Sequence, residues 1–144
     1  MKIRQFESND TEPVLNLANT HAVFDSPLTA ADLAITRQLP EAFILAEQEY
    51  QIVGFVFGYV RDVLSEVLAN WNVSKVGQVE LLVVDPNSRT NGVGTMLLES
   101  LLEVFAKNGV DMVTLHCPAE ATEAKSLYDK VGFETRAYAM RKRL

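Results

Sequence analysis

The second half of the chain alternates between apolar runs and amphipathic stretches. Residues 79–84 form an apolar run typical of a strand, and residues 110–116 form another. Between them, residues 95–107 place one apolar face in helical register: Leu97, Leu98, Leu101, Leu102 and Phe105. A further helix is predicted over residues 120–131 and a last strand over 133–144, with Tyr138, Met140 and Leu144 on one face. Strand–helix–strand crossovers of this length predict parallel neighbouring strands.

The first half predicts antiparallel pairing instead. Residues 2–6 alternate as a short strand, and a helix follows that Ser8, Asn9 or Asp10 can cap. After a loop at 24–28, Thr29 caps a short helix that ends at Pro40, and residues 42–47 and 52–61 form a hairpin. For residues 62–75 the sequence allows two interpretations, a short helix around 64–68 or a long loop. The fold class is therefore α/β, with a mixed sheet of about six to seven strands and about four helices.

Composition narrows the class of protein. A chain of 144 residues with 48% hydrophobic and 22% charged residues predicts a single globular domain over residues 1–144. No apolar run approaches the roughly 18 residues of a membrane span, and the N-terminus lacks the apolar core of a signal peptide. The single cysteine excludes an internal disulfide, so a cytoplasmic location is expected. A net charge of −6 argues against nucleic-acid binding.

The loop at residues 84–94 carries the strongest chemical signal. It contains Arg89, Gly92 and Gly94 between a predicted strand and a predicted helix. Unpaired N–H groups at a helix N-terminus bind phosphate, glycines allow the backbone to approach a ligand, and arginine adds a cation. The alternative is an ordinary strand-to-helix turn with a solvated arginine.

The spacing Arg89-x-x-Gly92-x-Gly94, after Asp85-Pro86-Asn87, resembles the pyrophosphate loop of the GCN5-related N-acetyltransferases, the GNAT superfamily. No Lys-Ser/Thr pair follows the glycines, so the loop is not a Walker A motif, and Leu97 breaks the dinucleotide-binding pattern. A second stretch, Ala124-x-x-Leu127-Tyr128-x-Lys130-x-Gly132-Phe133, is similar to another signature of that family. The order of elements also matches, so the resemblance covers nearly the whole chain.

The resemblance implies an acetyl-CoA site in which two central parallel strands splay apart. The pyrophosphate would bind the N–H groups of Asn91, Gly92, Val93 and Gly94, with contributions from Arg89, Thr90 and Thr95. The backbone of Leu82, Val83 and Val84 would pair with the pantetheine arm, and an N–H near Leu82 would stabilise the oxyanion. The family often has asparagine where this chain has Ala121, so one cofactor hydrogen bond is missing or comes from elsewhere.

Two residues are candidates for proton transfer. Tyr128 corresponds to the family's tyrosine near the cofactor sulfur and would protonate the departing thiolate, and it counts among the cofactor-binding residues. Glu80 interrupts an apolar strand, where a carboxylate is costly unless it is paired or functional, so it is the candidate general base. The alternatives are that Glu80 points to solvent and that a water chain removes the proton.

Other residues carry weaker signals. His21 and His116 are interpreted as structural, and no metal site is expected because neither has a partner at ligand spacing. Cys117 is interpreted as a small buried side chain. The run Arg141-Lys142-Arg143 protects an edge strand or marks the rim of a homodimer. Trp71 and Phe24 are candidate contacts with the acceptor substrate.

Together these features predict an acetyl-CoA-dependent N-acetyltransferase. The acetyl group would pass to a primary amine of a small molecule, protein or peptide by direct attack in a ternary complex. Two alternatives remain open: a non-catalytic acyl-CoA sensor or interaction module with this fold, and a different phosphate-anion binder without acyl chemistry.

Overall fold

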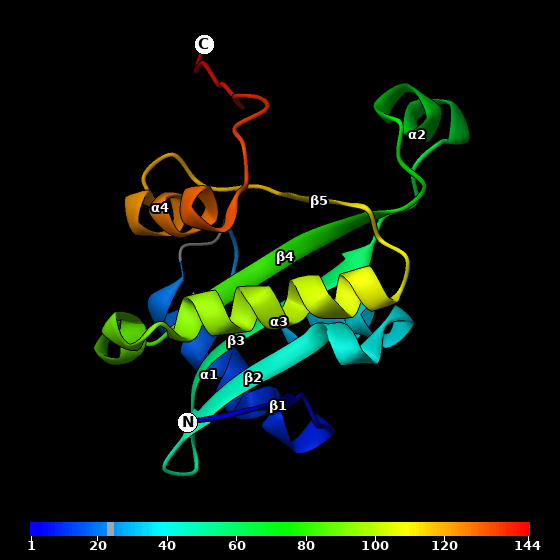
Figure 1. The fold of residues 1–144 in the computed structure, drawn as a ribbon. Coiled ribbons are helices and arrows are strands. Elements are labelled where there is room, and N and C mark those ends of the chain that lie inside the picture. Colours follow the sequence, from blue (N-terminus) through cyan, green and yellow to red (C-terminus); the bar gives the residue numbers. More distant parts are fainter. Residues whose placement is uncertain (23–24) are drawn as a thin grey trace.

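The computed structural model describes residues 1–22 and 25–144, and it contains one mixed five-stranded sheet in the order β1-β2-β3-β4-β5 (Figure 1). The strands are β1 (Lys2–Gln5), β2 (Phe43–Gln48), β3 (Gln51–Val60), β4 (Val76–Val84) and β5 (Met112–Leu115). The α-helices are α1 (Thr11–His21), α2 (Ser65–Trp71), α3 (Val93–Lys107) and α4 (Thr122–Val131). Four 3-10 helices complete these elements: η1 (Ser8–Asp10), η2 (Ala30–Gln38), η3 (Pro40–Ala42) and η4 (Pro86–Asn91).

The strand directions confirm the two kinds of pairing predicted from the sequence. Strands β1 to β4 pair antiparallel, and β5 pairs parallel to β4 across the α3 crossover. The parallel pairing extends only from Val76↔Met112 to Val79↔Leu115, although β4 continues to Val84. The two parallel strands therefore splay apart, and the second half of β4 has no neighbour on its β5 side.

Helices cover both faces of the sheet. Helix α3 packs on β2, β3 and β4, and its apolar stripe is fully buried at Leu97, Leu98, Leu101 and Phe105. On the opposite face, α1 and η2 bury Val14, Leu17, Ala18 and Leu33 against the phenylalanines of β2 and β3. Figure 1 shows α3 in front of the sheet and α1 behind it. This arrangement fixes β4 rigidly from both sides.

Two predicted elements differ in the structure. Residues 133–144 form no strand, so the sheet has five strands rather than six or seven. An alternating pattern of apolar and polar residues is compatible with an extended strand, but it does not provide the partner strand with which that strand must pair. The helix capped by Thr29 is a 3-10 helix, in which Thr29 and Asp32 form a capping box. Residues 62–75, for which a short helix and a long loop were both possible, contain α2, and Trp71 is the last residue of that helix.

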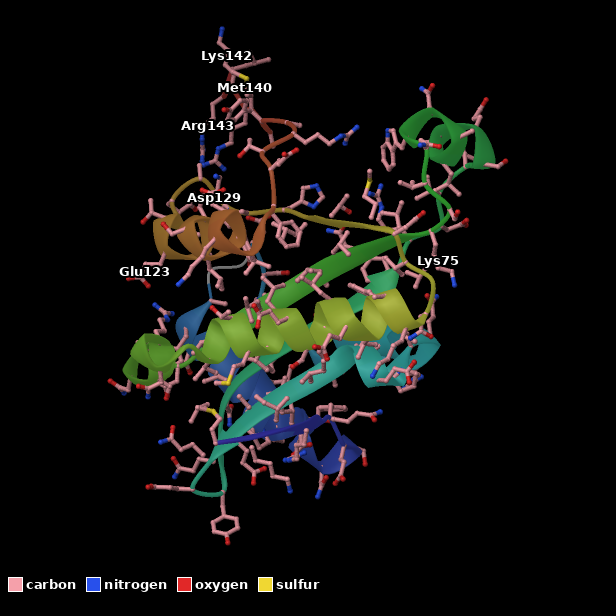
Figure 2. All side chains as sticks on the ribbon, viewed as in Figure 1. Lys75, Glu123, Asp129, Met140, Lys142 and Arg143 are labelled. Carbon is pink, nitrogen blue, oxygen red and sulfur yellow. The ribbon has the colours of Figure 1, made fainter. Side chains whose placement is uncertain are left out.

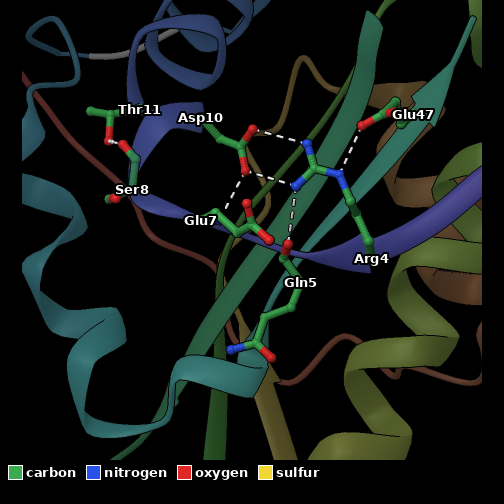
Figure 3. A network of polar contacts seen from close by, with 7 residues as sticks. All are labelled: Arg4, Gln5, Glu7, Ser8, Asp10, Thr11 and Glu47. Atoms are coloured by element: carbon green, nitrogen blue, oxygen red, sulfur yellow. Dashed lines mark hydrogen bonds and ion pairs between the residues drawn. The ribbon is translucent and has the colours of Figure 1, made fainter. Parts of the chain in front are cut away.

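The N-terminal strand is held by a polar cluster around Arg4 (Figure 3). The Arg4 guanidinium donates to Glu47 of β2 at 2.7 Å and to both oxygens of Asp10 at 2.8 and 2.9 Å. Asp10 also accepts the Glu7 N–H at 2.8 Å, as in a capping box. The hydrogen bonds from Arg4 hold the pKa of Asp10 below its usual value. The cluster joins β1, η1 and β2.

Candidate functional site

The splay between β4 and β5 opens into a cleft of about 840 Å³. One wall is the second half of β4, the floor includes the start of α3, and the other wall is α4 with the segment that precedes it. The walls carry these residues: His21, Ala22, Val79–Val84, Arg89, Gly92, Gly94, Thr95, Leu115–Pro118, Glu120–Ala124 and Ser126–Tyr128. The cleft therefore combines the two motif regions that lie about 30 residues apart in the sequence.

The N-terminus of α3 presents free backbone donors to this cleft. Gly92 caps the helix at φ +73°, a left-handed conformation that favours glycine, and no side chain caps the helix there. The Met96 N–H makes the first intrahelical bond, to the Gly92 carbonyl at 3.0 Å. The N–H groups of Val93, Gly94 and Thr95 precede that bond and have no partner within the helix. This is the geometry of an anion site.

Gly94 lies close to neighbouring side chains. A Cβ at this position would lie 3.1 Å from Leu127 Cδ2 and 3.7 Å from Val84 Cγ2. The start of α3 therefore approaches both α4 and the end of β4, and a side chain at this position would require a small shift of Leu127.

Arg89 lies across the mouth of the cleft. Its Nε donates to the Val84 carbonyl at 3.1 Å, and its guanidinium is 3.4 Å from Glu123 Oε2 on α4. Figure 2 shows Glu123 on α4, directed toward solvent. Because Glu123 is largely exposed, this ion pair is weak and the guanidinium can turn to another anion.

A β-bulge marks the centre of β4. Phe57 pairs with Leu81 and Gly58 with Val79, which leaves Glu80 as the extra residue. Its side chain is exposed and lines the cleft, so the carboxylate is not buried, and its role as general base stays a prediction. The bulge removes Glu80 from the ladder and changes the direction of its side chain. The three residues predicted to pair with pantetheine, Leu82, Val83 and Val84, all line the cleft.

Tyr128 reaches the cleft from α4. Its side chain is only 8% exposed, and its ring packs edge-on against Phe133 with the centroids 5.9 Å apart. Burial raises the pKa of Tyr128 to about 12, with a smaller contribution from Cys117. The phenol therefore stays protonated at neutral pH and is available as a hydrogen-bond donor.

His116 and Cys117, which were interpreted as structural residues from the sequence, also line the cleft. Arg61 donates to Thr114 Oγ1 at 3.0 Å, and the Thr114 hydroxyl donates to Gln78 Oε1 at 2.6 Å. This orients the Gln78 amide with its Nε2 3.4 Å from His116 Nδ1. In the neutral tautomer with its proton on Nε2, His116 therefore accepts from Gln78 and directs an N–H elsewhere.

The remaining candidates are placed as follows. Cys117 is half-buried, and burial raises the pKa of its thiol, which disfavours the nucleophilic thiolate. Trp71 does not line the cleft: its ring stacks under Arg136, whose Cζ is 4.8 Å from the ring centroid. Phe24 lies outside the described residues.

Two predicted loop residues, Asn91 and Val93, are not among the residues that line the cleft. The side chain of Thr90, a third predicted residue, lies outside what the structure describes. The Val93 side chain is fully buried in the core, so only its backbone is available. Ala121 and His21 do line it, and a methyl group occupies the position where the resemblance expects an amide. Among residues 1–22 and 25–144, no group of three or more His, Cys, Asp or Glu side chains could hold a metal.

Comparison with known proteins agrees with this geometry. The model of the acetyltransferase (GNAT) family matches residues 7–133. L-2,4-diaminobutyric acid acetyltransferase of Nocardia farcinica is 30% identical over 108 residues, which cover 75% of this chain and 51% of that protein. The chain thus spans about half the length of that relative.

Two solved structures share the fold. The structure of Ard1 from Thermoplasma volcanium superposes with a TM-score of 0.79, 27% identity and coverage of 94% of this chain and 84% of the other. AAC(6')-Iy in complex with the bisubstrate analogue CoA-S-monomethyl-acetylneamine superposes with a TM-score of 0.75, 22% identity and coverage of 99% and 98%. The chain belongs to the acetyltransferase (GNAT) family, as its two motifs predict. None of the helices in the described residues has the length and apolar character to cross a membrane.

Proposed function

We propose that this protein is an N-acetyltransferase that moves the acetyl group of acetyl-CoA to a primary amine in a ternary complex. The observation that carries the proposal is one cleft that joins three features. These are the free N–H groups at the start of α3, the unpaired edge of β4 and the hydroxyl of Tyr128. The named relative acts on diaminobutyric acid, which is itself an amine.

Binding of acetyl-CoA would use the backbone more than side chains. The pyrophosphate suits the N–H groups of Val93, Gly94 and Thr95 at the positive end of the α3 dipole, with Arg89 turning from Glu123 to the phosphates. The pantetheine arm suits the free edge of Leu82, Val83 and Val84, where it would continue the sheet as an added strand. An N–H of this edge would then stabilise the oxyanion.

Catalysis requires removal of a proton from the amine and stabilisation of the departing thiolate. The amine must lose a proton before it attacks the thioester carbonyl, because a protonated alkyl amine has no free electron pair. Glu80 and a water chain are the candidates for that step. His116 is not a candidate base in this geometry, because its acceptor nitrogen Nδ1 faces the Gln78 amide and its other nitrogen carries a proton. When the tetrahedral intermediate collapses, the sulfur leaves with the electron pair of the C–S bond, and the Tyr128 hydroxyl donates to it.

Direct attack is favoured over an acyl-enzyme intermediate on Cys117. Transfer through a thiol needs the thiolate, and the surroundings of Cys117 favour the protonated form. A Cys117→Ala variant is therefore expected to retain its activity.

The proposal is tested by measuring the release of free CoA thiol from acetyl-CoA with a panel of amines. Diamino acids come first, and aminoglycosides, polyamines and peptide N-termini follow. Release with at least one amine, with mass spectrometry showing the acetylated product, is the expected result. Cofactor binding without release across the whole panel would contradict it and favour the acyl-CoA sensor.

A further inference from the structure

One face of the sheet carries polar side chains beyond the part that α1 and η2 cover. Tyr59 lies near the end of β3, and Arg61 directly follows that strand, with its N–H still donating to the Val76 carbonyl at 2.8 Å. Side chains two residues apart on a strand point to the same face. Helix α3 packs on the opposite face, since a Cβ on Gly58 would lie 2.8 Å from the Phe105 ring. Tyr59 and Arg61 belong to neither hydrophobic cluster.

The polar side chains of this face form a row that ends at the cleft. Thr114 accepts a hydrogen bond from Arg61 and donates one to Gln78. The Gln78 amide lies 3.4 Å from His116, which lines the cleft, and Glu80 lines the same cleft two residues after Gln78. Direct contacts therefore connect Arg61 to the place where acetyl transfer is proposed.

The Arg61 guanidinium is a half-buried cation without a carboxylate partner. Its Nη1 donates to the neutral Thr114 hydroxyl, and its Cζ lies 5.9 Å from the centroid of the Trp71 ring. Arg136 approaches the same ring, with its Cζ 4.8 Å from the centroid. Among residues 1–22 and 25–144, neither guanidinium forms an ion pair. Two like charges beside one ring attract an anion, and a guanidinium with free N–H groups binds carboxylate or phosphate through paired hydrogen bonds.

Glu80 provides the opposite charge at the other end of the row. Tyr59 lies between the two charged groups: burial raises the pKa of Tyr59, the Glu80 carboxylate raises it further, and the Arg61 guanidinium lowers it. The two charges do not pair with each other in the described part of the chain. Because Arg61 lies opposite Val76, roughly 13 Å of β4 separates it from Glu80. A ligand with a cation at one end and an anion at the other would match both groups.

We propose that the acceptor substrate is a small amine that also carries an oxyanion group, a carboxylate or a phosphate, and that Arg61 binds this group while the amine faces Glu80 and the thioester. The inference rests on the acetyl transfer proposed above. Arg136 adds a second cation, and Trp71 holds both guanidinium groups in position.

The oxyanion group orients the acceptor and takes no part in the chemistry. The amine nitrogen forms the new bond to the acetyl carbon, and the C–S bond breaks with its electron pair going to the sulfur. The proton of the amine leaves to Glu80 or to the water chain. An acceptor with unlike charges at its two ends binds in one direction, which brings the amine rather than the anion to the thioester.

The first test uses the unaltered chain and pairs of acceptors that differ only in the anion. One pair is 6-aminohexanoate and 6-aminohexanamide, and the other is 5-aminopentyl phosphate and 5-aminopentanol. The release of CoA thiol gives kcat/KM for each acceptor. The charged member of at least one pair is expected to exceed its neutral partner by about tenfold or more, the size of a charge-assisted hydrogen bond. The pair with the larger ratio identifies the oxyanion as carboxylate or phosphate.

Variants then assign the preference to Arg61. Arg61→Gln should raise the KM for the charged acceptor and abolish the preference, while the KM for acetyl-CoA stays unchanged. Arg61→Lys keeps the charge but loses the paired donors, so an intermediate preference is expected. Lys107→Gln is the matched control, because it removes one exposed positive charge from α3, on the other face of the sheet, and should keep the full preference.

The outcomes separate this inference from the proposed function. Equal kcat/KM within both pairs overturns the inference, although acetyl transfer itself stands. A preference that persists in Arg61→Gln, or one that Lys107→Gln abolishes equally, also overturns it. The absence of thiol release with every amine overturns the proposed function, and the inference falls with it.

Discussion

Tyr128 belongs to the hydrophobic core and to the cleft at the same time. Its ring packs with Phe133 and the α3 side of the core, while its hydroxyl reaches the cleft. A phenol with a pKa near 12 transfers its proton to a thiolate only reluctantly, but it donates a strong hydrogen bond to one. The residue therefore suits stabilisation of the leaving sulfur without itself ionising.

Replacement of Tyr128 by phenylalanine tests this role. The Tyr128→Phe variant is expected to lower kcat by roughly 100-fold or more, the size typical of a lost hydrogen-bond donor to a developing negative charge, while the KM for acetyl-CoA changes little. Tyr59→Phe is the matched control, since Tyr59 is also a tyrosine of raised pKa but is not among the residues that line the cleft. An unchanged kcat in steady-state assays would remove Tyr128 from the mechanism.

Asp10 makes the free energy of unfolding depend on pH in the acidic range. Because Arg4 lowers the pKa of Asp10 in the folded state, the ionised carboxylate stabilises the fold above its unfolded value of about 4. That contribution disappears as the pH falls through the lower folded value. Asp10→Ala is expected to cost about 1–3 kcal/mol at neutral pH, since it removes the bonds to Arg4 and to the Glu7 N–H.

Urea unfolding at several pH values measures this effect. The difference in the free energy of unfolding between the unaltered chain and Asp10→Ala should be largest near neutral pH and should shrink in acid. Asp129→Ala is the comparison, because its ion pair with Lys125 is exposed on α4 and its loss should cost less than about 0.5 kcal/mol. A difference that grew in acid would contradict the assignment.

At the scale of elements, helix α3 offers a matched pair of glycines. Gly92 precedes its first turn at φ +73° and Gly109 follows its last turn at φ +81°, and a Cβ at either position meets no atom within 4 Å. Valine at either site therefore causes the same kind of backbone strain. Only Gly92 lies beside the proposed pyrophosphate site.

We expect Gly92→Val to weaken CoA binding by at least about tenfold and Gly109→Val to leave it unchanged. About 1.4 kcal/mol corresponds to that factor, which is modest for lost contacts to a charged phosphate. Isothermal titration calorimetry on both variants measures the affinities, and circular dichroism checks that each is folded. Equal affinities for the two variants would refute the backbone site at the start of α3.

The elements that were predicted correctly have local patterns strong enough to specify them. The apolar stripe of α3 and the polar turn between β2 and β3 determine their structures within a few residues, and both are found. The exposure of Glu80 could not be decided from such a local pattern. Its sequence neighbours are apolar, but the bulge opposite Gly58 comes from a register shift between two strands, and no local pattern contains it.

The strand predicted over residues 133–144 is absent for a different reason. The alternation of this segment is that of a strand, but a strand needs a neighbour, and the sequence does not name one. His116 looked isolated because Arg61, Thr114 and Gln78 approach it from other strands rather than from nearby sequence positions. The glycine loop and Tyr128 were found because each belongs to a motif with fixed spacing, whereas partnerships across the sheet have none.

At the scale of the whole molecule, acetyl-CoA should stabilise the fold by binding only the folded state. At a concentration 100 times its Kd, a ligand adds about 2.7 kcal/mol, which raises the melting temperature by roughly 5–10 °C for a chain of this size. ATP and NAD share the diphosphate but lack the pantetheine arm, so their shifts should be smaller. Differential scanning fluorimetry measures all three, and the absence of any shift with excess acetyl-CoA would contradict the cofactor assignment.

The divergence of β4 and β5 has a mechanical consequence. Only four residue pairs, Val76↔Met112 to Val79↔Leu115, tie β5 to the remainder of the sheet, and α4 follows β5. A ligand bound between the two strands would contact both of them and hold them at a fixed separation. Ligand binding should therefore reduce the motion of α4 more than that of the other helices.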